Sequence, residues 1–194
     1  QDIDYLSLGS YFNLVREAGF VRPDGVDISL NQELMSRILE ELNLIPKVTE
    51  FLNLHQENIY FNAKIDALVR LDGERKKKNG YDDALEFHRD VDSLSFVKAF
   101  SYLVDVEKGF GEHYVCSGSH RNLPLHLRFI KRFNQAQLAN TMSDFNLKCV
   151  TGKCGFSWIE NTTAFHRGSV PTIGDRLILS LSFNDSTSIK HLED

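Results

Sequence analysis

Residues 60–69 read YFNAKIDALV, and along this stretch apolar and polar side chains alternate with a period of two. One face of the stretch carries only apolar residues, and three of the four residues between them are polar. Successive side chains of a β-strand point to opposite faces, so this pattern predicts a half-buried strand. The apolar set is Phe61, Ala63, Ile65, Ala67 and Val69.

Further short strands are expected downstream, and glycine-rich turns separate them. Many short strands joined by turns favour an antiparallel sandwich or barrel over a fold of alternating strands and helices. One interruption, residues 125–138, predicts a helix with Arg128, Lys131 and Arg132 on its polar side. We therefore expect a jelly roll over about residues 60–184, with strands at 84–90, 94–104, 113–116, 155–160, 163–166 and 176–183.

The first part of the chain, about residues 8–56, has helical rather than strand periodicity. Apolar residues recur one helical turn apart in this part, and Pro46 is expected to break the pattern before a third short helix at 48–54. Such apolar stripes are typical of helices that pack on a sheet. We therefore expect one α+β domain over 1–194, mainly β, whose N-terminal helices cover one face; the clearest stripe is Leu30, Leu34, Ile38 and Leu42.

Composition restricts the class of protein. The 194 residues are 42% hydrophobic and 25% charged, as in ordinary folded proteins. A net charge of −5 gives no general attraction to nucleic acid or to an anionic membrane, and no apolar run approaches the about 20 residues of a membrane span. The first residues resemble no signal peptide, and three cysteines favour a reducing compartment over a disulfide framework. We expect a cytoplasmic protein; the sequence specifies no oligomeric state.

The segment His88-Arg89-Asp90 is the most informative chemical feature. On a strand, residues i and i+2 point to the same side, so the imidazole and the carboxylate would converge and could bind one metal ion. His166, expected at the end of a late strand, offers a third ligand. Two histidines and one carboxylate with open coordination positions describe a non-haem Fe(II) site that activates oxygen.

Arg176 adds a second chemical requirement. It follows His166 by ten residues and opens the apolar strand expected at 176–183. A buried guanidinium needs an anion, and its planar fork suits a carboxylate. A metal triad with a nearby buried arginine indicates a dicarboxylate co-substrate that binds the iron at one end and Arg176 at the other.

The order of these motifs resembles the phytanoyl-CoA dioxygenase family, which contains Fe(II)- and 2-oxoglutarate-dependent oxygenases. The likeness is carried by residues 87–90, 116–121 and 165–176, within the half of the chain from Phe87 to Phe183. It implies a double-stranded β-helix of the cupin-like jelly-roll type. It also implies that His88, Asp90 and His166 bind iron, that Arg176 binds the distal carboxylate of 2-oxoglutarate, and that Phe100 lines the co-substrate pocket.

The activity implied by this resemblance is oxidative decarboxylation of 2-oxoglutarate by O2, coupled to hydroxylation of a C–H bond. Related halogenases lack the carboxylate ligand, so Asp90 favours hydroxylation. A small-molecule substrate is the leading interpretation, and two alternatives remain open. One is a peptide or protein hydroxylase of the same fold, and the other is a cupin-like binding protein without turnover.

Several other residues have two interpretations. We interpret His113 and His126 as ordinary surface or helix residues, and His120 as support for the Gly-Ser-His turn rather than a metal ligand. Trp158 would either line the pocket or pack in the core. Lys98 is either a second carboxylate contact or, as we favour, an edge lysine that reaches water.

Two short segments complete the sequence-based picture. Residues 75–78, Arg-Lys-Lys-Lys, are interpreted as a solvated loop, or alternatively as a basic rim that attracts an anionic substrate. Cys149 and Cys154 flank an expected hairpin bend, and without a second pair of thiols they do not indicate a zinc site.

Overall fold

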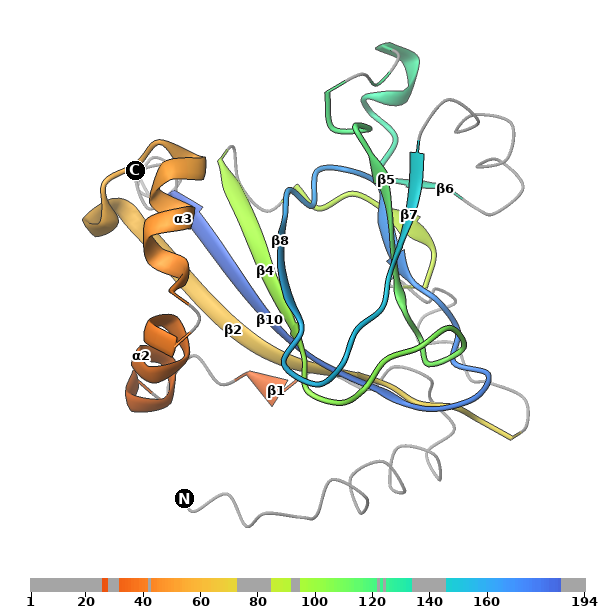
Figure 1. Cartoon of the computed structure of the whole chain (residues 1–194). Helices are drawn as coiled ribbons and strands as arrows, with labels where there is room; N and C mark the ends of the chain where they lie inside the picture. The colour runs from red at the N-terminus through yellow and green to blue at the C-terminus, as the bar shows by residue number, and fades with distance from the viewer. Residues whose placement is uncertain are drawn as a thin grey trace.

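The computed structural model describes residues 26–27, 32–41, 43–72, 85–91, 95–121, 123, 125–133 and 146–185. Within them lie two antiparallel sheets of five strands, ordered β1-β2-β10-β4-β8 and β6-β3-β9-β5-β7 (Figure 1). The elements are β1 Val26–Asp27, α2 Gln32–Glu41, α3 Leu44–Leu52, the 3-10 helix Gln56–Asn58, β2 Ile59–Leu68, β3 Phe87–His88, β4 Phe96–Tyr102, β5 His113–Ser117, the 3-10 helix Leu125–Leu127, β6 Arg132–Phe133, β7 Asn146–Val150, β8 Ser157–Glu160, β9 His166–Gly168 and β10 Arg176–Asp185.

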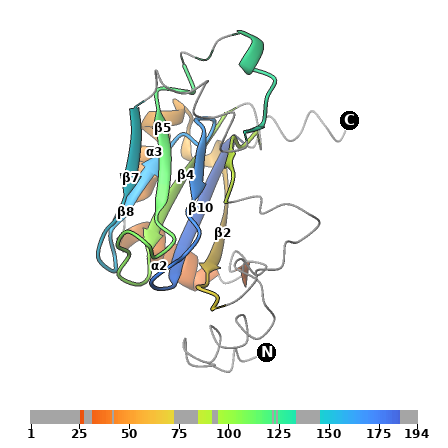
Figure 2. The same ribbon diagram turned by 90° about the vertical axis from the view of Figure 1, so that its right-hand side faces the viewer.

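The path of the chain makes this a jelly roll. Strands β3 and β4 lie in different sheets, and so do β7 and β8, and β9 and β10. The chain therefore passes back and forth between two sheets that face each other (Figures 1 and 2). The predicted fold class, a double-stranded β-helix with helices on one face, is confirmed.

Alternation along β2, β4 and β10 gives the first sheet two different faces. Opposed residues of an antiparallel pair share a face, so Leu179 and Leu181 of β10 lie with Ala63 of β2 and Ala99 of β4. Helix α3 covers this outer face through Val48, which is fully buried. Burying such a side chain contributes about 1.5–3 kcal/mol. The opposite, inner face presents Arg176, Ile178 and Ser180 to the second sheet, and the candidate site lies there.

Two expectations about the N-terminal part were wrong in detail. Helix α3 begins at Leu44, so Pro46 lies in its first turn rather than ending the preceding pattern. Proline is tolerated there because the first N–H groups of a helix have no partner within it. The short strand β1 also lies inside the part expected to be helical, where Val26 pairs with Ile65 of β2.

The prediction of a helix at 125–138 was also wrong for residues 125–133, which the structure describes. This segment forms one 3-10 turn and then β6, in which Phe133 pairs with Phe87 of β3. The carbonyl of Lys131 accepts the backbone N–H of Arg89 at 2.9 Å. The backbone N–H and C=O groups of this segment therefore form hydrogen bonds to β3 and are not available for the hydrogen bonds of a helix. Residues 134–138 lie outside the described part of the chain.

Strand β7 was not expected, and it changes the interpretation of the neighbouring bend. β7 pairs with β5 in one sheet, whereas β8 pairs with β4 in the other, so residues 151–156 connect two sheets and do not close a hairpin. The three cysteines, Cys116, Cys149 and Cys154, are free thiols. No helix among the described residues is long and apolar enough to cross a membrane.

Candidate metal and co-substrate site

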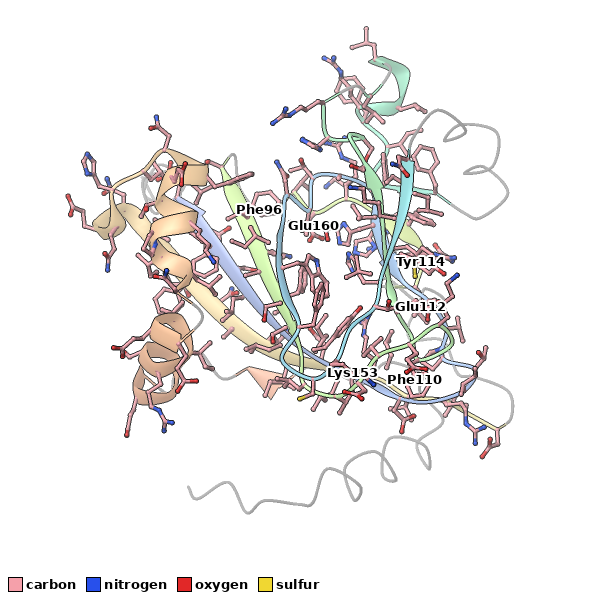
Figure 3. The ribbon with its side chains drawn as sticks, viewed as in Figure 1. Phe96, Phe110, Glu112, Tyr114, Lys153 and Glu160 are labelled. Atoms are coloured by element: carbon pink, nitrogen blue, oxygen red, sulfur yellow. The ribbon has the colours of Figure 1, made fainter. Side chains whose placement is uncertain are left out.

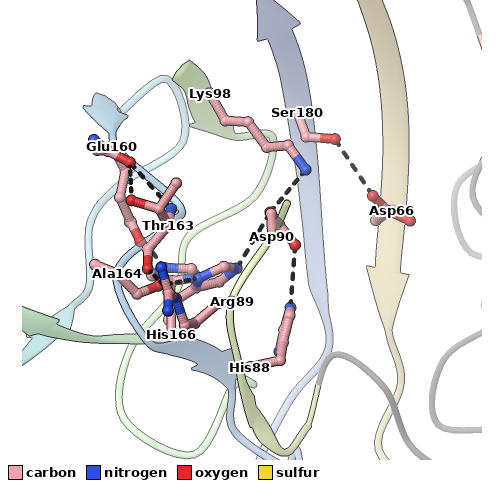
Figure 4. Close-up of polar contacts among 12 residues, drawn as sticks. Asp66, His88, Arg89, Asp90, Lys98, Glu160, Thr163, Ala164, His166 and Ser180 are labelled. Atoms are coloured by element: carbon pink, nitrogen blue, oxygen red, sulfur yellow. Dashed lines mark hydrogen bonds and ion pairs between the residues drawn. The ribbon is translucent and has the colours of Figure 1, made fainter. Parts of the chain in front are cut away.

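The second sheet brings His88, Asp90 and His166 together (Figure 4). His88 ends β3 and His166 begins β9, and the two residues are direct partners across these strands. Asp90 lies just beyond β3, where its backbone N–H donates to the carbonyl of Thr162 at 2.9 Å. One ligand atom from each side chain lies within 4.8 Å of the others. The predicted triad is therefore assembled in space.

Backbone carbonyls orient both imidazoles. Nδ1 of His88 lies 2.8 Å from the carbonyl oxygen of Glu86, and Nδ1 of His166 lies 2.9 Å from that of Ala164. A carbonyl oxygen only accepts, so each Nδ1 carries the proton. The Nε2 lone pairs are left to face Asp90, at 3.8 Å from Oδ1 for His88 and 3.6 Å from Oδ2 for His166. This is how metal-binding histidines are commonly held.

The protonation states suit a dication. Burial, and next the charge of His166, lower the pKa of His88 to about 3. Burial also lowers the pKa of His166, with a smaller contribution from His113. Burial alone would raise the pKa of Asp90, but His166 and Lys98 outweigh it and lower that pKa. At neutral pH the cluster is two neutral imidazoles and one carboxylate, the forms that bind a metal.

The depressed histidine pKa values predict an acid-sensitive fold for the metal-free protein. Histidines of the unfolded chain take up protons near pH 6.5, whereas His88 in the folded protein resists protonation until about pH 3. The stability that this shift in pKa contributes is therefore fully present above about pH 6.5 and is lost as the pH falls toward 3. From pH 7.5 to pH 5, His88 takes up a proton in the unfolded chain but not in the folded protein. We expect this difference to lower the free energy of unfolding by about 2 kcal/mol. Urea unfolding at pH 7.5 and at pH 5 measures this loss. The loss should be smaller in His88→Ala. Equal free energies of unfolding of the parent at the two pH values would contradict the prediction.

Lys98 contacts the carboxylate of the triad. Its Nζ lies 2.8 Å from Oδ2 of Asp90, and its side chain is only 17% exposed. The favoured interpretation as an edge lysine was wrong, because β4 lies between β10 and β8 and is not an edge strand. The ion pair restrains the rotation of the carboxylate.

Arg176 opens β10, as expected, and is 5% exposed. Its Nη1 donates to the carbonyl of Gly111 at 2.8 Å. Arg176 and the triad line the same cavity of about 150 Å³, which Phe100 also lines. A cavity of about this size accommodates a molecule as large as benzene. All five residues predicted for the site therefore share one small cavity.

Gly168 leaves room for the arginine. A Cβ at this position would lie 3.1 Å from Nη1 of Arg176 and 2.8 Å from Cδ1 of Leu68. We expect Gly168→Ala to displace the guanidinium, to weaken about tenfold the binding of the 2-oxoglutarate that the motif resemblance implies, and to cost about 1–3 kcal/mol of stability. Calorimetric titration with 2-oxoglutarate measures the loss of affinity.

Gly155→Ala is the matched control for this substitution. Gly155 has a φ of +87°, and a Cβ there would meet nothing within 4 Å. That variant should lose stability through backbone strain while it keeps the affinity for 2-oxoglutarate. Equal losses of affinity in both variants would show that Gly168 has no specific role.

His113 was interpreted as an ordinary residue, and this was wrong. It opens β5, is 4% exposed and lines the same cavity. Its ring stacks on that of His166 with centroids 5.5 Å apart, and its Nε2 lies 2.9 Å from Oε2 of Glu160. The sequence contained one indication of this position. His113 opens a predicted strand and lies two residues before Val115, so both side chains are on the same face, and Val115 pairs with His166 on the neighbouring strand.

Trp158 packs against the site rather than lining its small cavity. Its ring stacks on Phe100 with centroids 5.2 Å apart, and Phe100 in turn faces His113 at 5.5 Å. The indole N–H of Trp158 donates to Oε2 of Glu160 at 3.1 Å. These three rings form one wall of the interior between the sheets.

The strand of His166 begins later than expected. The side chain of Asn161 accepts the backbone N–H of Thr163 at 3.1 Å and its hydroxyl at 2.6 Å, which holds the chain in a turn. Ser119 then accepts the backbone N–H of Phe165 at 2.8 Å. The Gly-Ser-His turn thus positions the residue before His166, as expected of a supporting turn, and His120 is not part of the triad.

Three earlier interpretations fall wholly or partly outside what the structure describes. Of the predicted stripe, Leu30, Leu42 and the side chain of Leu34 are not described. The basic segment 75–78 lies among residues that are not described, and so does the side chain of His126.

The chain matches no protein-family model and no curated protein, whereas it is similar to several solved structures. HygX from Streptomyces hygroscopicus with iron bound is 17% identical, with a TM-score of 0.58 over 93% of this chain and 79% of that one. The epimerase SnoN, in complex with Fe3+, alpha ketoglutarate and nogalamycin RO, is 18% identical, with a TM-score of 0.60 over 92% and 71%. EvdO2 from Micromonospora carbonacea var. aurantiaca, complexed with 2-oxoglutarate, is 12% identical, with a TM-score of 0.55 over 83% and 67%. At these identities the likeness shows that the chain shares their fold.

Proposed function

We propose that this chain is an Fe(II)- and 2-oxoglutarate-dependent dioxygenase that hydroxylates a small molecule. The observation that carries the proposal is one cavity lined by a His-Asp-His cluster and by the buried guanidinium of Arg176. Metal ligands and a buried cation are the two groups that a chelating dicarboxylate requires. The three similar structures named above are described with iron (HygX), with Fe3+ and alpha ketoglutarate (SnoN) and with 2-oxoglutarate (EvdO2), which supports the same assignment.

The residues fit the metal. Two neutral imidazoles and a carboxylate, with Nε2 atoms directed at Asp90, form the donor set that Fe(II) takes in oxygenases. His88, Asp90 and His166 would hold the ion. When bound, iron and 2-oxoglutarate supply oxygen activation, in which 2-oxoglutarate, O2 and R–H give succinate, carbon dioxide and R–OH.

The protein's own contribution is to position the co-substrate and the metal ligands and to exclude water from the site. Arg176 would bind the distal carboxylate of 2-oxoglutarate and so fix which end reaches the metal. Lys98 holds Asp90 at 2.8 Å and the backbone carbonyls hold both histidines, so the ligands are oriented in advance. Phe100 would cover the co-substrate and exclude water from it.

The substrate class rests on the interior of the jelly roll. The described cavities between the sheets have the volume of small molecules, and SnoN is described in complex with nogalamycin RO. Both support a small-molecule substrate over a peptide. The motif order supports the finer assignment to the phytanoyl-CoA dioxygenase family, and the three free thiols support the cytoplasm as the compartment.

Release of labelled carbon dioxide from 2-oxoglutarate labelled at C1 tests the proposed function. The protein with Fe(II) should release it slowly in air without substrate, and faster with a correct substrate. Zn(II) in place of Fe(II) should give none, because Zn(II) has no redox chemistry. An equal rate with the two metals, or none with Fe(II), would contradict the proposal.

A further inference from the structure

The two carboxylate oxygens of Asp90 have different surroundings (Figure 4). Oδ1 lies 3.8 Å from Nε2 of His88. Oδ2 accepts a hydrogen bond of 2.8 Å from Nζ of Lys98 and lies 3.6 Å from Nε2 of His166. Both side chains of the ion pair are only 17% exposed. Hydrogen bonds between charged groups are short and strong, so Oδ2 is engaged by the ammonium group while Oδ1 faces His88.

Lys98 reaches Asp90 from the opposite sheet. It lies on β4, where its strand partners are Ser182 of β10 and Glu160 of β8, and its side chain lines the cavity of the metal cluster. Asp90 follows β3, which belongs to the second sheet. Because β4 is paired on both sides, the backbone that carries the ammonium group is held in place. The ion pair therefore connects one oxygen of Asp90 to the facing sheet.

The number of coordination positions makes the difference between the two oxygens important. An octahedral ion bound by two histidines and one carboxylate oxygen has three further positions. A chelating 2-oxoglutarate would take two of them, which leaves one for O2. A carboxylate binds a metal through one oxygen or through both. If Asp90 used both oxygens, 2-oxoglutarate would fill the site and no position would remain.

We propose that Lys98 restricts Asp90 to binding the metal through one oxygen and so preserves the coordination position that O2 requires. The ammonium group engages Oδ2, and it would be repelled by a dication bound to that oxygen. Oδ1 is then the oxygen that is left for the metal. Lys98 is a positioning residue that acts through Asp90. This inference rests on the proposed function, because it concerns the coordination that the reaction requires.

The number of water molecules bound to Mn(II) provides a direct readout. Mn(II) suits octahedral sites rich in oxygen ligands, and waters bound to it speed up the relaxation of solvent protons in proportion to their number. The full chain is loaded with Mn(II), and proton relaxation is recorded without and with 2-oxoglutarate. In the parent, the three protein ligands should leave three waters, and a chelating 2-oxoglutarate should replace two of them.

Lys98→Met removes the ammonium group and keeps the apolar stem. Asp90 should then bind through both oxygens, so the variant should hold two waters and its bound-water relaxation should be about one third smaller than in the parent. With 2-oxoglutarate present this relaxation should disappear, whereas the parent keeps one water. Decarboxylation of 2-oxoglutarate by the Fe(II) protein should also fall at least about tenfold, as is usual for partners of metal ligands.

Lys153→Met is the matched control. Lys153 pairs with Asp105 at 2.9 Å, nearly the distance of the pair at the cluster, but its side chain is 78% exposed. It lies in the connection from β7 to β8, whereas Glu160, the strand partner of Lys98, lies at the opposite end of β8 (Figure 3). This variant should hold as many waters as the parent. Lys98→Gln, which is uncharged and one bond shorter, repeats the test if near-UV circular dichroism shows that Lys98→Met is unfolded.

The parent measurement separates the two proposals. If 2-oxoglutarate leaves the bound-water relaxation of the parent unchanged, it does not chelate the metal, and the proposed function fails together with the inference. If 2-oxoglutarate does displace water, the inference is overturned when the parent keeps no water, or when Lys98→Met keeps as many waters as the parent. A folded Lys98→Met that no longer binds Mn(II) would also overturn it, because Lys98 would then be needed to hold Asp90 in place at all.

Discussion

Replacing either histidine of the cluster, as in His88→Ala or His166→Ala, is expected to abolish turnover and to weaken metal binding at least about 100-fold. The triad supplies three ligand atoms within 4.8 Å, and two ligands do not hold a dication in a site that must keep open positions. Substitution of groups that merely orient metal ligands already costs about 10- to 100-fold in affinity. Titration calorimetry with Fe(II) under anaerobic conditions measures the loss.

Two other histidines serve as controls for these substitutions. His55→Ala removes an exposed imidazole, and His120→Ala removes one in the Gly-Ser-His turn outside the triad. Both variants should bind Fe(II) as the parent does. If His88→Ala kept the parent affinity while His120→Ala lost it, the metal would lie elsewhere than the structure indicates.

Arg176→Met is expected to lower the affinity for 2-oxoglutarate at least about 100-fold while Fe(II) affinity stays within a few-fold of the parent. The guanidinium is 5% exposed, and removal of one partner of a buried, charged hydrogen bond costs about 2–5 kcal/mol. Methionine keeps the apolar stem, so the loss reflects the charge. The KM for 2-oxoglutarate, compared with kcat, and direct calorimetry are the two measurements.

Arg37→Met controls for a general loss of positive charge. Arg37 lies on α2, where its side chain is 69% exposed and makes a long ion pair of 3.8 Å with Glu41. This variant should keep the parent KM. An unchanged KM in Arg176→Met would mean that 2-oxoglutarate binds without that guanidinium, and the orientation given to the co-substrate would be wrong.

The parts of the fold that were predictable are strands whose own sequence carries a strong pattern, which is alternation in β2 and a mainly apolar run in β10. Residues 60–69 gave β2 to within about one residue at each end, and the apolar run after Arg176 gave β10. Alternation marks the first half of β2, whereas the end of β2 and most of β10 are buried on both faces between the helices and the interior. The cluster was predictable because His88, Asp90 and His166 carry an uncommon combination of ligand types.

Other features depend on contacts between residues distant in sequence. Strand β7 is half exposed at a sheet edge, so its sequence carries little alternation. The segment 125–133 has helical spacing, but pairing with β3 determines its conformation. Lys98 reaches Asp90 because the two sheets face each other, whereas His113 lies beside His166 because β5 pairs with β9 in the same sheet.

The most direct test of the central claim is anaerobic titration of the purified protein with Fe(II) and then 2-oxoglutarate, monitored by visible absorption. Chelation of the metal by 2-oxoglutarate gives a weak charge-transfer band. The account predicts that this band appears in the parent, is absent in His88→Ala, and requires far more 2-oxoglutarate in Arg176→Met. A parent protein that binds neither Fe(II) nor 2-oxoglutarate would contradict the account and would favour a jelly-roll binding protein without turnover.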